Sequence, residues 1–307
     1  MLRLGLAALA AGAAGYAAIQ HLRPMPSIRG RTVVVVGASA GIGRCLALEY
    51  ARGGAELLLC ARRATELEQV RAECEAAGAA VVLCVAADIT HRETQLVLRR
   101  CAVEMWGRVD YLVLNAGAIS VLEVVDLWGM RTADGLRAAD GDAADRADQA
   151  LQQIMAVNLH APAALAGLFL PLVAECRGVI VVVSSMAGLV AAPTRSLYSA
   201  SKHAVTGYFN ALRMEVARLG VAVTIAYPGS VATDLRQSAV DIREPGATVA
   251  GSESRMAPAV CARQIVRAAA LRQPSLVTPW PYAVAAGLYA IAPGLVDWAA
   301  KRKYALA

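Results

Sequence analysis

Patterns that bind metals or form disulfides are missing from this sequence. Its seven cysteines contain no Cys-x-x-Cys pair, and its four histidines do not cluster. Most of the cysteines stand inside apolar runs, where a thiol behaves as a small buried hydrophobic group. We therefore expect no metal site and no disulfides, and free thiols fit a reducing compartment.

Charged residues are also scarce, at 18% of the 307 residues, whereas hydrophobic residues reach 57%. The net charge is +6, but the basic residues are scattered and form no stripe with interleaved aromatic side chains. This distribution argues against nucleic acid as a partner. It fits a large buried core combined with an anionic membrane surface or a phosphorylated cofactor.

One long uncharged run is present near the N-terminus, at residues 4–20. A membrane-spanning helix needs ~20 residues, so this run is just long enough for an anchor. A cleaved signal peptide and an Ala-rich soluble helix are the alternatives; we favour an anchor, with residues 1–27 as anchor and linker. More basic residues follow the run than precede it, which places the main domain in the cytoplasm. None of the three asparagines begins an Asn-x-Ser/Thr glycosylation sequence, which agrees with that side.

A glycine-rich turn follows the first β-branched run. Thr32–Val36 is predicted to be a strand, residues 37–43 have the spacing G-x-x-x-G-x-G, and an apolar-periodic helix follows over residues 44–52. Glycines permit a tight turn and close approach of the backbone, and a helix N-terminus favours negative charge. This order predicts a pyrophosphate site rather than a plain connection. Its residues are Gly37, Ser39, Ala40, Gly41, Ile42 and Gly43.

The second strand, residues 55–61, ends at Arg62 and Arg63. An acidic residue about 20 positions after the glycine motif would hold the ribose 2′-hydroxyl of NAD, but none stands there. A guanidinium instead suits the 2′-phosphate of NADP(H). We therefore predict NADP(H) as the cofactor; a solvated basic pair is the alternative and implies no preference.

The α/β alternation continues along the chain and predicts a doubly wound parallel sheet. Residues 129–148 are rich in Asp, Arg, Gly and Ala and are expected to form a solvated loop with at most a helical turn. Residues 234–257 are expected to form a mobile cover over a substrate. The further strands are expected at residues 80–86, 110–115, 179–184, 221–227 and 275–278. The helices are expected at residues 65–77, 91–106, 150–175 and 258–272, and the helix that carries Tyr198 and Lys202 is expected to continue to about residue 219.

Polar and small residues follow the ends of several strands. Asp88 could contact the adenine or cap the next helix. Asn158, inside the helix of residues 150–175, is costly to bury without partners, so it is either a packing hub or part of a proton path. The remaining cofactor positions are Asn115, Ala116, Gly117, Pro228, Gly229, Val231 and Thr233.

The most informative stretch contains Tyr198 and Lys202, which are four residues apart and share one face of a helix. An ammonium beside a phenol favours the phenolate and lowers the phenol pKa from ~10 towards the working range. Ser185, at the end of a strand, could face the phenol across a substrate carbonyl. This set can move a proton while another group moves a hydride, although a Tyr and a Lys one turn apart also occur on solvated helices.

The tail, residues 279–307, holds five of the thirteen Trp and Tyr residues and includes the basic run at residues 301–303. Aromatic and basic residues flanking an apolar helix suit a membrane interface. A dimer contact and a wall of the substrate entrance are the alternatives.

Taken together, these motifs resemble the short-chain dehydrogenase/reductase family, in that family's order over about residues 30–278. The anchor, the phrases VVVSSMAG and YSASKHA, and the aromatic tail are most similar to its membrane-associated 11-beta-hydroxysteroid dehydrogenase-like members. The resemblance implies a single Rossmann domain, residues 28–278, with a mostly parallel seven-stranded sheet.

The resemblance also implies roles for four residues. Tyr198 would be the catalytic acid or base, and Lys202 would lower its pKa and bind the nicotinamide ribose. Ser185 would hydrogen-bond the substrate oxygen, and Asn158 would support a water relay to Lys202.

The expected function is that of a membrane-associated NADP(H)-dependent oxidoreductase. It would interconvert a ketone or aldehyde and an alcohol on a hydrophobic, steroid- or lipid-like substrate. An endoplasmic-reticulum membrane is expected in a eukaryotic source, and a homodimer is compatible with the family. The alternative is a dinucleotide-binding membrane scaffold with little turnover, whose loop at residues 129–148 serves partner assembly.

Overall fold

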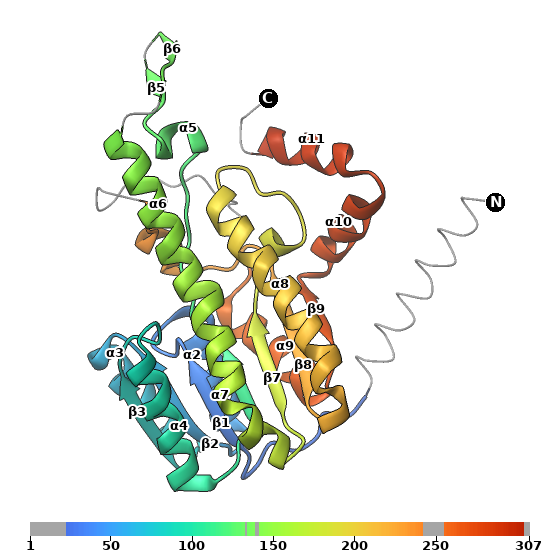
Figure 1. The fold of residues 1–307 in the computed structure, drawn as a ribbon. Helices are drawn as coiled ribbons and strands as arrows, with labels where there is room; N and C mark the ends of the chain where they lie inside the picture. Colours follow the sequence, from blue (N-terminus) through green and yellow to red (C-terminus); the bar gives the residue numbers. More distant parts are fainter. Residues whose placement is uncertain (1–22, 133, 139–140, 242–254, 304–307) are drawn as a thin grey trace, which may run out of the picture.

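The computed structural model of the protein describes residues 23–132, 134–138, 141–241 and 255–303. Its centre is a parallel sheet of seven strands in the order β3-β2-β1-β4-β7-β8-β9 (Figure 1). The predicted doubly wound sheet is thereby confirmed. The strands are β1 (Thr32–Val36), β2 (Glu56–Ala61), β3 (Val82–Ala86), β4 (Tyr111–Leu114), β7 (Val179–Val183), β8 (Ala222–Pro228) and β9 (Ser275–Thr278).

Helices cover both faces of the sheet. Successive strand residues point to opposite faces, so each strand contributes to two cores. Val33 packs with Ile265 in one core, whereas Val34 packs with Phe169 in the other. One layer consists of α2 (Gly41–Arg52), α3 (Ala64–Ala77) and α9 (Pro258–Ala270); the other, towards the viewer in Figure 1, consists of α4 (Arg92–Trp106), α7 (Ala161–Glu175) and α8 (Ser196–Val216).

The strand order places the site. β2 and β3 extend to one side of β1, and β4 starts the half of the sheet that extends to the other side. Open α/β sheets bind ligands at the carboxyl edge of such a switch point. The glycine turn follows β1 and Asn115 follows β4, so the two lie together at that edge.

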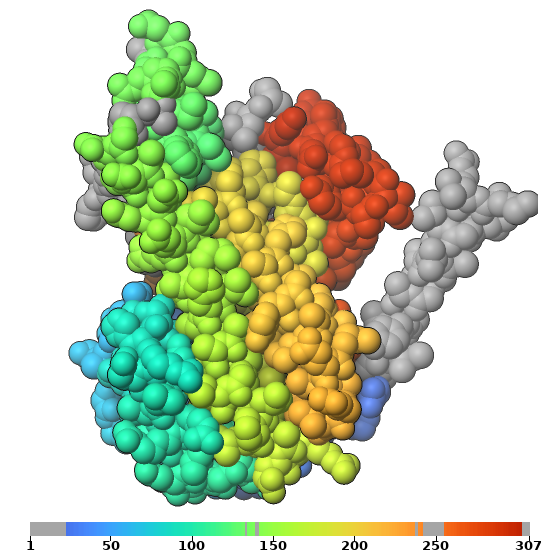
Figure 2. Space-filling view, viewed as in Figure 1, coloured from blue at the N-terminus to red at the C-terminus, as the bar shows by residue number. Residues whose placement is uncertain are grey.

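The segment at residues 129–148 differs from the predicted solvated loop. After α5 (Val124–Leu127), strands β5 (Arg131–Thr132) and β6 (Gly135–Leu136) form a small antiparallel hairpin. It lies within the projection at the top of Figure 2. A regular helix, α6 (Gly141–Met155), then begins well before residue 150.

The loop prediction failed because the buried face of α6 is built largely from alanine. Ala143, Ala147 and Ala150 are buried and lie on one face, while Asp and Arg residues cover the rest. Alanine is a strong helix former but a weak hydrophobic marker, so the helical period was hidden among the charges.

The predicted single helix over residues 150–175 is interrupted by η1 (Ala156–His160), a π-helical turn between α6 and α7. Pro162, in the first turn of α7, has no N–H to donate to the carbonyl of Asn158 four residues earlier. A wider turn accommodates this missing bond, and single π-helical turns often occur at functional sites.

The run Gly141–Glu175 is the one helix in the described chain long and apolar enough to cross a membrane by length and composition. Leu165 and Phe169 of this run are fully buried against the sheet, as expected for a core helix. The predicted anchor at residues 4–20 lies outside the described residues.

The structure bears on two further predicted segments, the cover at residues 234–257 and the C-terminal tail. The cover over residues 234–257 begins as η4 (Asp234–Ser238), and its residues 242–254 lie outside the described part of the chain. The tail after β9 forms two helices, α10 (Trp280–Ile291) and α11 (Pro293–Lys303).

Candidate active site

Ser185 and Tyr198 meet at the carboxyl end of β7. Ser185 precedes η2 (Met186–Gly188), and its hydroxyl accepts a hydrogen bond from the Ala187 N–H at 3.2 Å. The Ser185 side chain is also close enough to the phenol of Tyr198 to act on its pKa. Tyr198 is only 8% exposed, whereas Ser185 is partly exposed.

Gly188 allows η2 to approach α8 closely. A Cβ added at Gly188 would lie 2.6 Å from the carbonyl oxygen of Lys202 and 2.9 Å from the hydroxyl of Ser184. A larger side chain would therefore separate the end of β7, and Ser185 with it, from α8. Gly188 was not predicted from the sequence, because nothing in the local pattern shows which helix it approaches.

Lys202 lies beside the phenol ring rather than in contact with its oxygen. Its Nζ donates to the carbonyl of Val183 at 3.0 Å and lies 5.8 Å from the centroid of the Tyr198 ring. Burial lowers the pKa of Lys202 to about 8. The amine is thus held by the strand that also positions Ser185.

The pKa of Tyr198 does not follow our prediction. Burial raises the pKa of this phenol, while the Ser185 side chain and the guanidiniums of Arg195 and Arg236 oppose that rise. The Nζ of Lys202 is turned to the Val183 carbonyl and lies 5.8 Å from the centre of the phenol ring. The pKa of the phenol is thus raised overall, and the expected lowering contribution of Lys202 stays a prediction.

Asn158 is a hydrogen-bond hub on η1. Its Oδ1 accepts from the Ala118 N–H at 2.7 Å, and its Nδ2 donates to the Ala118 carbonyl at 2.9 Å and to the Ser201 hydroxyl at 2.8 Å. Ser201 in turn donates to the carbonyl of Tyr198 at 2.8 Å. Asn158 thus ties the loop after β4 to the turn of α8 that carries Tyr198. The predicted water relay from Asn158 to Lys202 stays a prediction.

The glycine turn is packed so tightly that side chains cannot replace its glycines. Gly37 has φ +82°, and a Cβ there would lie 2.7 Å from the backbone of Ala116. A Cβ at Gly43 would lie 1.9 Å from the Gly37 carbonyl oxygen and 2.5 Å from Nδ2 of Asn115. That Nδ2 donates to the same carbonyl at 3.0 Å. α2 starts at Gly41, so the turn presents a helix N-terminus and bare backbone, which fits a pyrophosphate.

Arg62 and Arg63 diverge from the end of β2. Arg63 donates to the hydroxyl of Ser39 in the glycine turn at 3.0 Å, whereas Arg62 is 71% exposed and lies 3.9 Å from the carboxylate of Asp88. Asp88 accepts from the N–H of Thr90 at 2.8 Å, so it caps the turn before α4. Burial raises the pKa of Asp88, but the hydrogen bonds from Thr90 and the charge of Arg62 outweigh that effect and lower it overall.

The Pro228–Gly229 turn contacts the C-terminal tail. A Cβ at Gly229 would lie 2.5 Å from the ring of Tyr282 in α10, so this glycine makes room for the tail. The side chain of Thr233 reaches the glycine turn, where a Cβ at Gly41 would lie 3.0 Å from it. The segment therefore connects α10 to the predicted pyrophosphate site.

Val231 and Gly117 line the same edge of the sheet. Val231 forms a parallel bridge with Met256, which ties the segment after β8 to the start of α9. A Cβ at Gly117 would lie 3.3 Å from Oδ1 of Asn158 and 3.7 Å from Nζ of Lys202. The structure thus gathers the predicted cofactor and catalytic positions at one edge of the sheet.

Comparison with known proteins decides the family. A family model described as short chain dehydrogenase matches residues 31–243. The chain belongs to this family. It is therefore an oxidoreductase whose fold binds a nicotinamide dinucleotide.

Several relatives share most of the length of this short-chain dehydrogenase. It is 34% identical over 256 residues to Hydroxysteroid 11-beta-dehydrogenase 1-like protein A of Xenopus laevis, covering 83% of this chain and 79% of the relative. A short chain dehydrogenase/reductase from Burkholderia phymatum, solved with NAD, aligns with a TM-score of 0.72 at 22% identity over 88% of this chain and 96% of that one. An alcohol dehydrogenase from the archaeon Thermococcus sibiricus, complexed with 5-hydroxy-NADP, aligns with a TM-score of 0.64 at 23% identity over 81% and 96%. At these identities the two solved structures confirm the fold alone.

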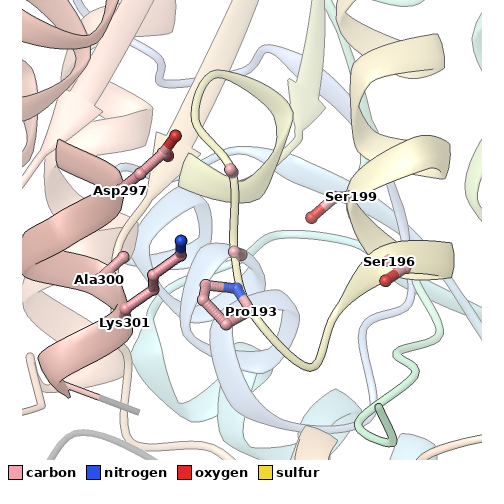
Figure 3. Close-up of a pocket in the computed structure, with 8 residues that line it drawn as sticks. Pro193, Ser196, Ser199, Asp297, Ala300 and Lys301 are labelled. Atoms are coloured by element: carbon pink, nitrogen blue, oxygen red, sulfur yellow. The ribbon is translucent and has the colours of Figure 1, made fainter. Parts of the chain in front are cut away.

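A cavity of about 370 Å³ lies between α11 and the first turns of α8. In Figure 3 α11 forms one wall and the first turns of α8 form the other, with Pro193 between them. Ser185, Tyr198 and Lys202 do not line it, but Ala192 of its wall packs in the same cluster as Tyr198. It is therefore an outer neighbour of the catalytic site. Its lining residues are Ala191, Ala192, Pro193, Ser196, Ser199, Asp297, Ala300 and Lys301.

Proposed function

We propose that this protein is a membrane-associated, NADP(H)-dependent oxidoreductase that interconverts a ketone or aldehyde and an alcohol on a hydrophobic, steroid- or lipid-like substrate. The observation that carries the proposal is the buried phenol of Tyr198, with the Ser185 side chain near it and the Lys202 Nζ 5.8 Å from the centre of its ring. The dinucleotide, when bound, supplies or accepts the hydride. The residues of the chain hold the substrate oxygen and move its proton.

Tyr198 and Ser185 share the work at the substrate oxygen. Burial raises the phenol pKa, so at neutral pH the phenol carries its proton and can donate it during reduction. Ser185 hydrogen-bonds the same oxygen and keeps it in line with the phenol. The nearby guanidiniums and the Lys202 ammonium stabilise the phenolate that remains, and oxidation uses the same groups in reverse.

The surroundings of Tyr198 support an apolar substrate. Its cluster contains Ile119, Val121 and Ile154, so the wall around the phenol is largely hydrocarbon. A relative is named Hydroxysteroid 11-beta-dehydrogenase 1-like protein A, which also supports a steroid-like substrate. The uncharged run at residues 4–20 supports a membrane location from sequence alone.

Both arginines after β2 support NADP(H) over NAD. Arg63 contacts the glycine turn itself, and Arg62 projects into solvent beside it, so two guanidiniums stand where a 2′-phosphate would be recognised. The nearby carboxylate of Asp88 accepts a hydrogen bond from the N–H of Thr90. The solved neighbours include one with NAD and one with an NADP derivative, so support for NADP(H) comes from these arginines.

The catalytic assignment is tested by Tyr198→Phe, with Tyr208→Phe on the exposed side of α8 as the matched control. Consumption of NADPH is measured across a panel of lipophilic ketones with detergent-solubilised protein. Loss of the proton donor is expected to lower kcat by on the order of 10²- to 10⁴-fold without changing NADPH affinity. Wild-type turnover by Tyr198→Phe would overturn the assignment. Tight NADPH binding by the wild type without turnover of any ketone would favour the scaffold alternative.

A further inference from the structure

Arg236 is a partly buried arginine with one buried nitrogen that has no hydrogen-bond partner in the described part of the chain. It lies on η4, and the buried nitrogen is its Nη1. None of the ion pairs found in the described chain includes Arg236. A buried guanidinium donor without an acceptor costs free energy of folding, and a bound anionic oxygen would remove that cost.

The location of Arg236 is set by its neighbours on η4. Leu235 and Ala239 pack in the cluster that surrounds Tyr198. Thr233, just before η4, contacts the glycine turn at Gly41. η4 therefore runs from the pyrophosphate site to the wall of the catalytic phenol, and the charge of Arg236 acts on that phenol.

Two other charged side chains near the site, Arg195 and Asp241, already have hydrogen-bond partners. Arg195 is also buried, but its Nη1 donates to the carbonyl of Val121 at 3.0 Å and to the hydroxyl of Thr194 at 2.6 Å. The carboxylate of Asp241 accepts from the hydroxyl of Ser120 and from the N–H groups of Val121 and Leu122. Arg195 and Asp241 thus hold the loop after β4.

We propose that Arg236 binds an anionic oxygen group, a carboxylate or a phosphate, beside Tyr198. The guanidinium fork suits either group, because it can donate two parallel hydrogen bonds. The anion has two sources: a phosphate of the dinucleotide, or an acidic group on a lipid-like substrate. This inference rests on the proposed function only for the second source.

The test uses the full chain in detergent with Arg236→Gln and Arg236→Lys, and with Arg263→Gln on the exposed side of α9 as the control. One arm measures the Kd for NADPH. The other measures equilibrium binding of a long-chain keto acid and of its methyl ester to the NADPH complex. Binding is measured rather than turnover, so an inactive wild type would count against the proposed function and leave both arms readable.

Loss of one charge-assisted hydrogen bond is expected to weaken binding by about 10- to 100-fold. A rise of that size in the NADPH Kd of Arg236→Gln assigns the anion to the dinucleotide. An unchanged NADPH Kd with the same loss for the acid, and none for the ester, assigns it to the substrate. Arg236→Lys should recover part of either loss, and thermal unfolding should show that each variant is folded. If Arg236→Gln matches Arg263→Gln in both arms, the proposal is wrong.

Discussion

Residues of the same type occupy different environments at this site, and their positions decide what each can bind. Arg62, Arg63 and Arg236 carry the same group, yet the first is exposed, the second contacts the glycine turn and the third has a buried nitrogen without a hydrogen-bond partner. Lys202, which the sequence marks as the charge partner of Tyr198, is instead held by the Val183 carbonyl. The position of each arginine, and not its residue type, therefore decides which group it can bind.

Arg62→Asp tests the cofactor preference at the residue scale. The substitution places an acid where a 2′-phosphate would lie, so NADPH affinity is expected to fall by on the order of 10- to 100-fold while NADH affinity is kept. Affinities for NADPH and NADH are compared by fluorescence titration. Arg100→Asp on α4 makes the same charge change at an exposed position as the control. An unchanged ratio of the two affinities in Arg62→Asp would contradict the 2′-phosphate assignment.

Two elements, the glycine turn and α8, carry most of the site. α8 can present Tyr198 and Lys202 on one face because of its helical period, but its distance from β7 depends on Gly188. The glycine turn depends in the same way on Gly43, which leaves no space for a methyl group beside Gly37 and Asn115. Small residues thus set how closely the elements approach.

Gly43→Ala should show this dependence. The new Cβ would overlap the Gly37 carbonyl oxygen, so the turn must shift; we expect a loss of about 1–3 kcal/mol of unfolding free energy and a marked loss of NADPH affinity. Gly207→Ala is the control, because its Cβ on exposed α8 meets nothing within 4 Å. That change should raise stability by about 0.5–1 kcal/mol, since alanine favours the helix. Both are measured by urea unfolding and NADPH titration. Normal NADPH binding by Gly43→Ala would show that the turn does not hold the pyrophosphate.

At the scale of the whole molecule, the tail places an apolar surface next to the substrate side. Trp280, Ile291, Leu295 and Trp298 are each more than half exposed, and Arg302 stacks over the ring of Trp298 at 4.7 Å. Exposed tryptophans with basic neighbours are typical of helices that lie in a membrane interface. The outer cavity is formed in part by α11 (Figure 3), so the proposed function leads us to expect that substrate enters from that surface.

Tryptophan fluorescence can test this arrangement. The chain has four tryptophans, and in vesicles with brominated lipids we expect strong quenching in the wild type from Trp280 and Trp298. Replacing both by Phe should abolish the quenching, whereas replacing the partly buried Trp106 and Trp128 by Phe should keep it. The opposite pattern, with quenching kept after the loss of Trp280 and Trp298, would rule out an interfacial tail.

The sequence by itself determined the sheet, the glycine turn and the Tyr198–Lys202 pair. These follow from local rules: strand alternation, the backbone freedom of glycine and the period of a helix. The tertiary structure decided what depends on contacts between distant segments. The partners of Asn158, Ala118 and Ser201, became known only from the structure. The same holds for the hydrogen bond from Lys202 to the Val183 carbonyl. Arg236 became a candidate only because its neighbours on η4 pack in the cluster that contains Tyr198. The physical reason is that a polar side chain is defined by the acceptor or charge it meets, and that group lies far away in the chain.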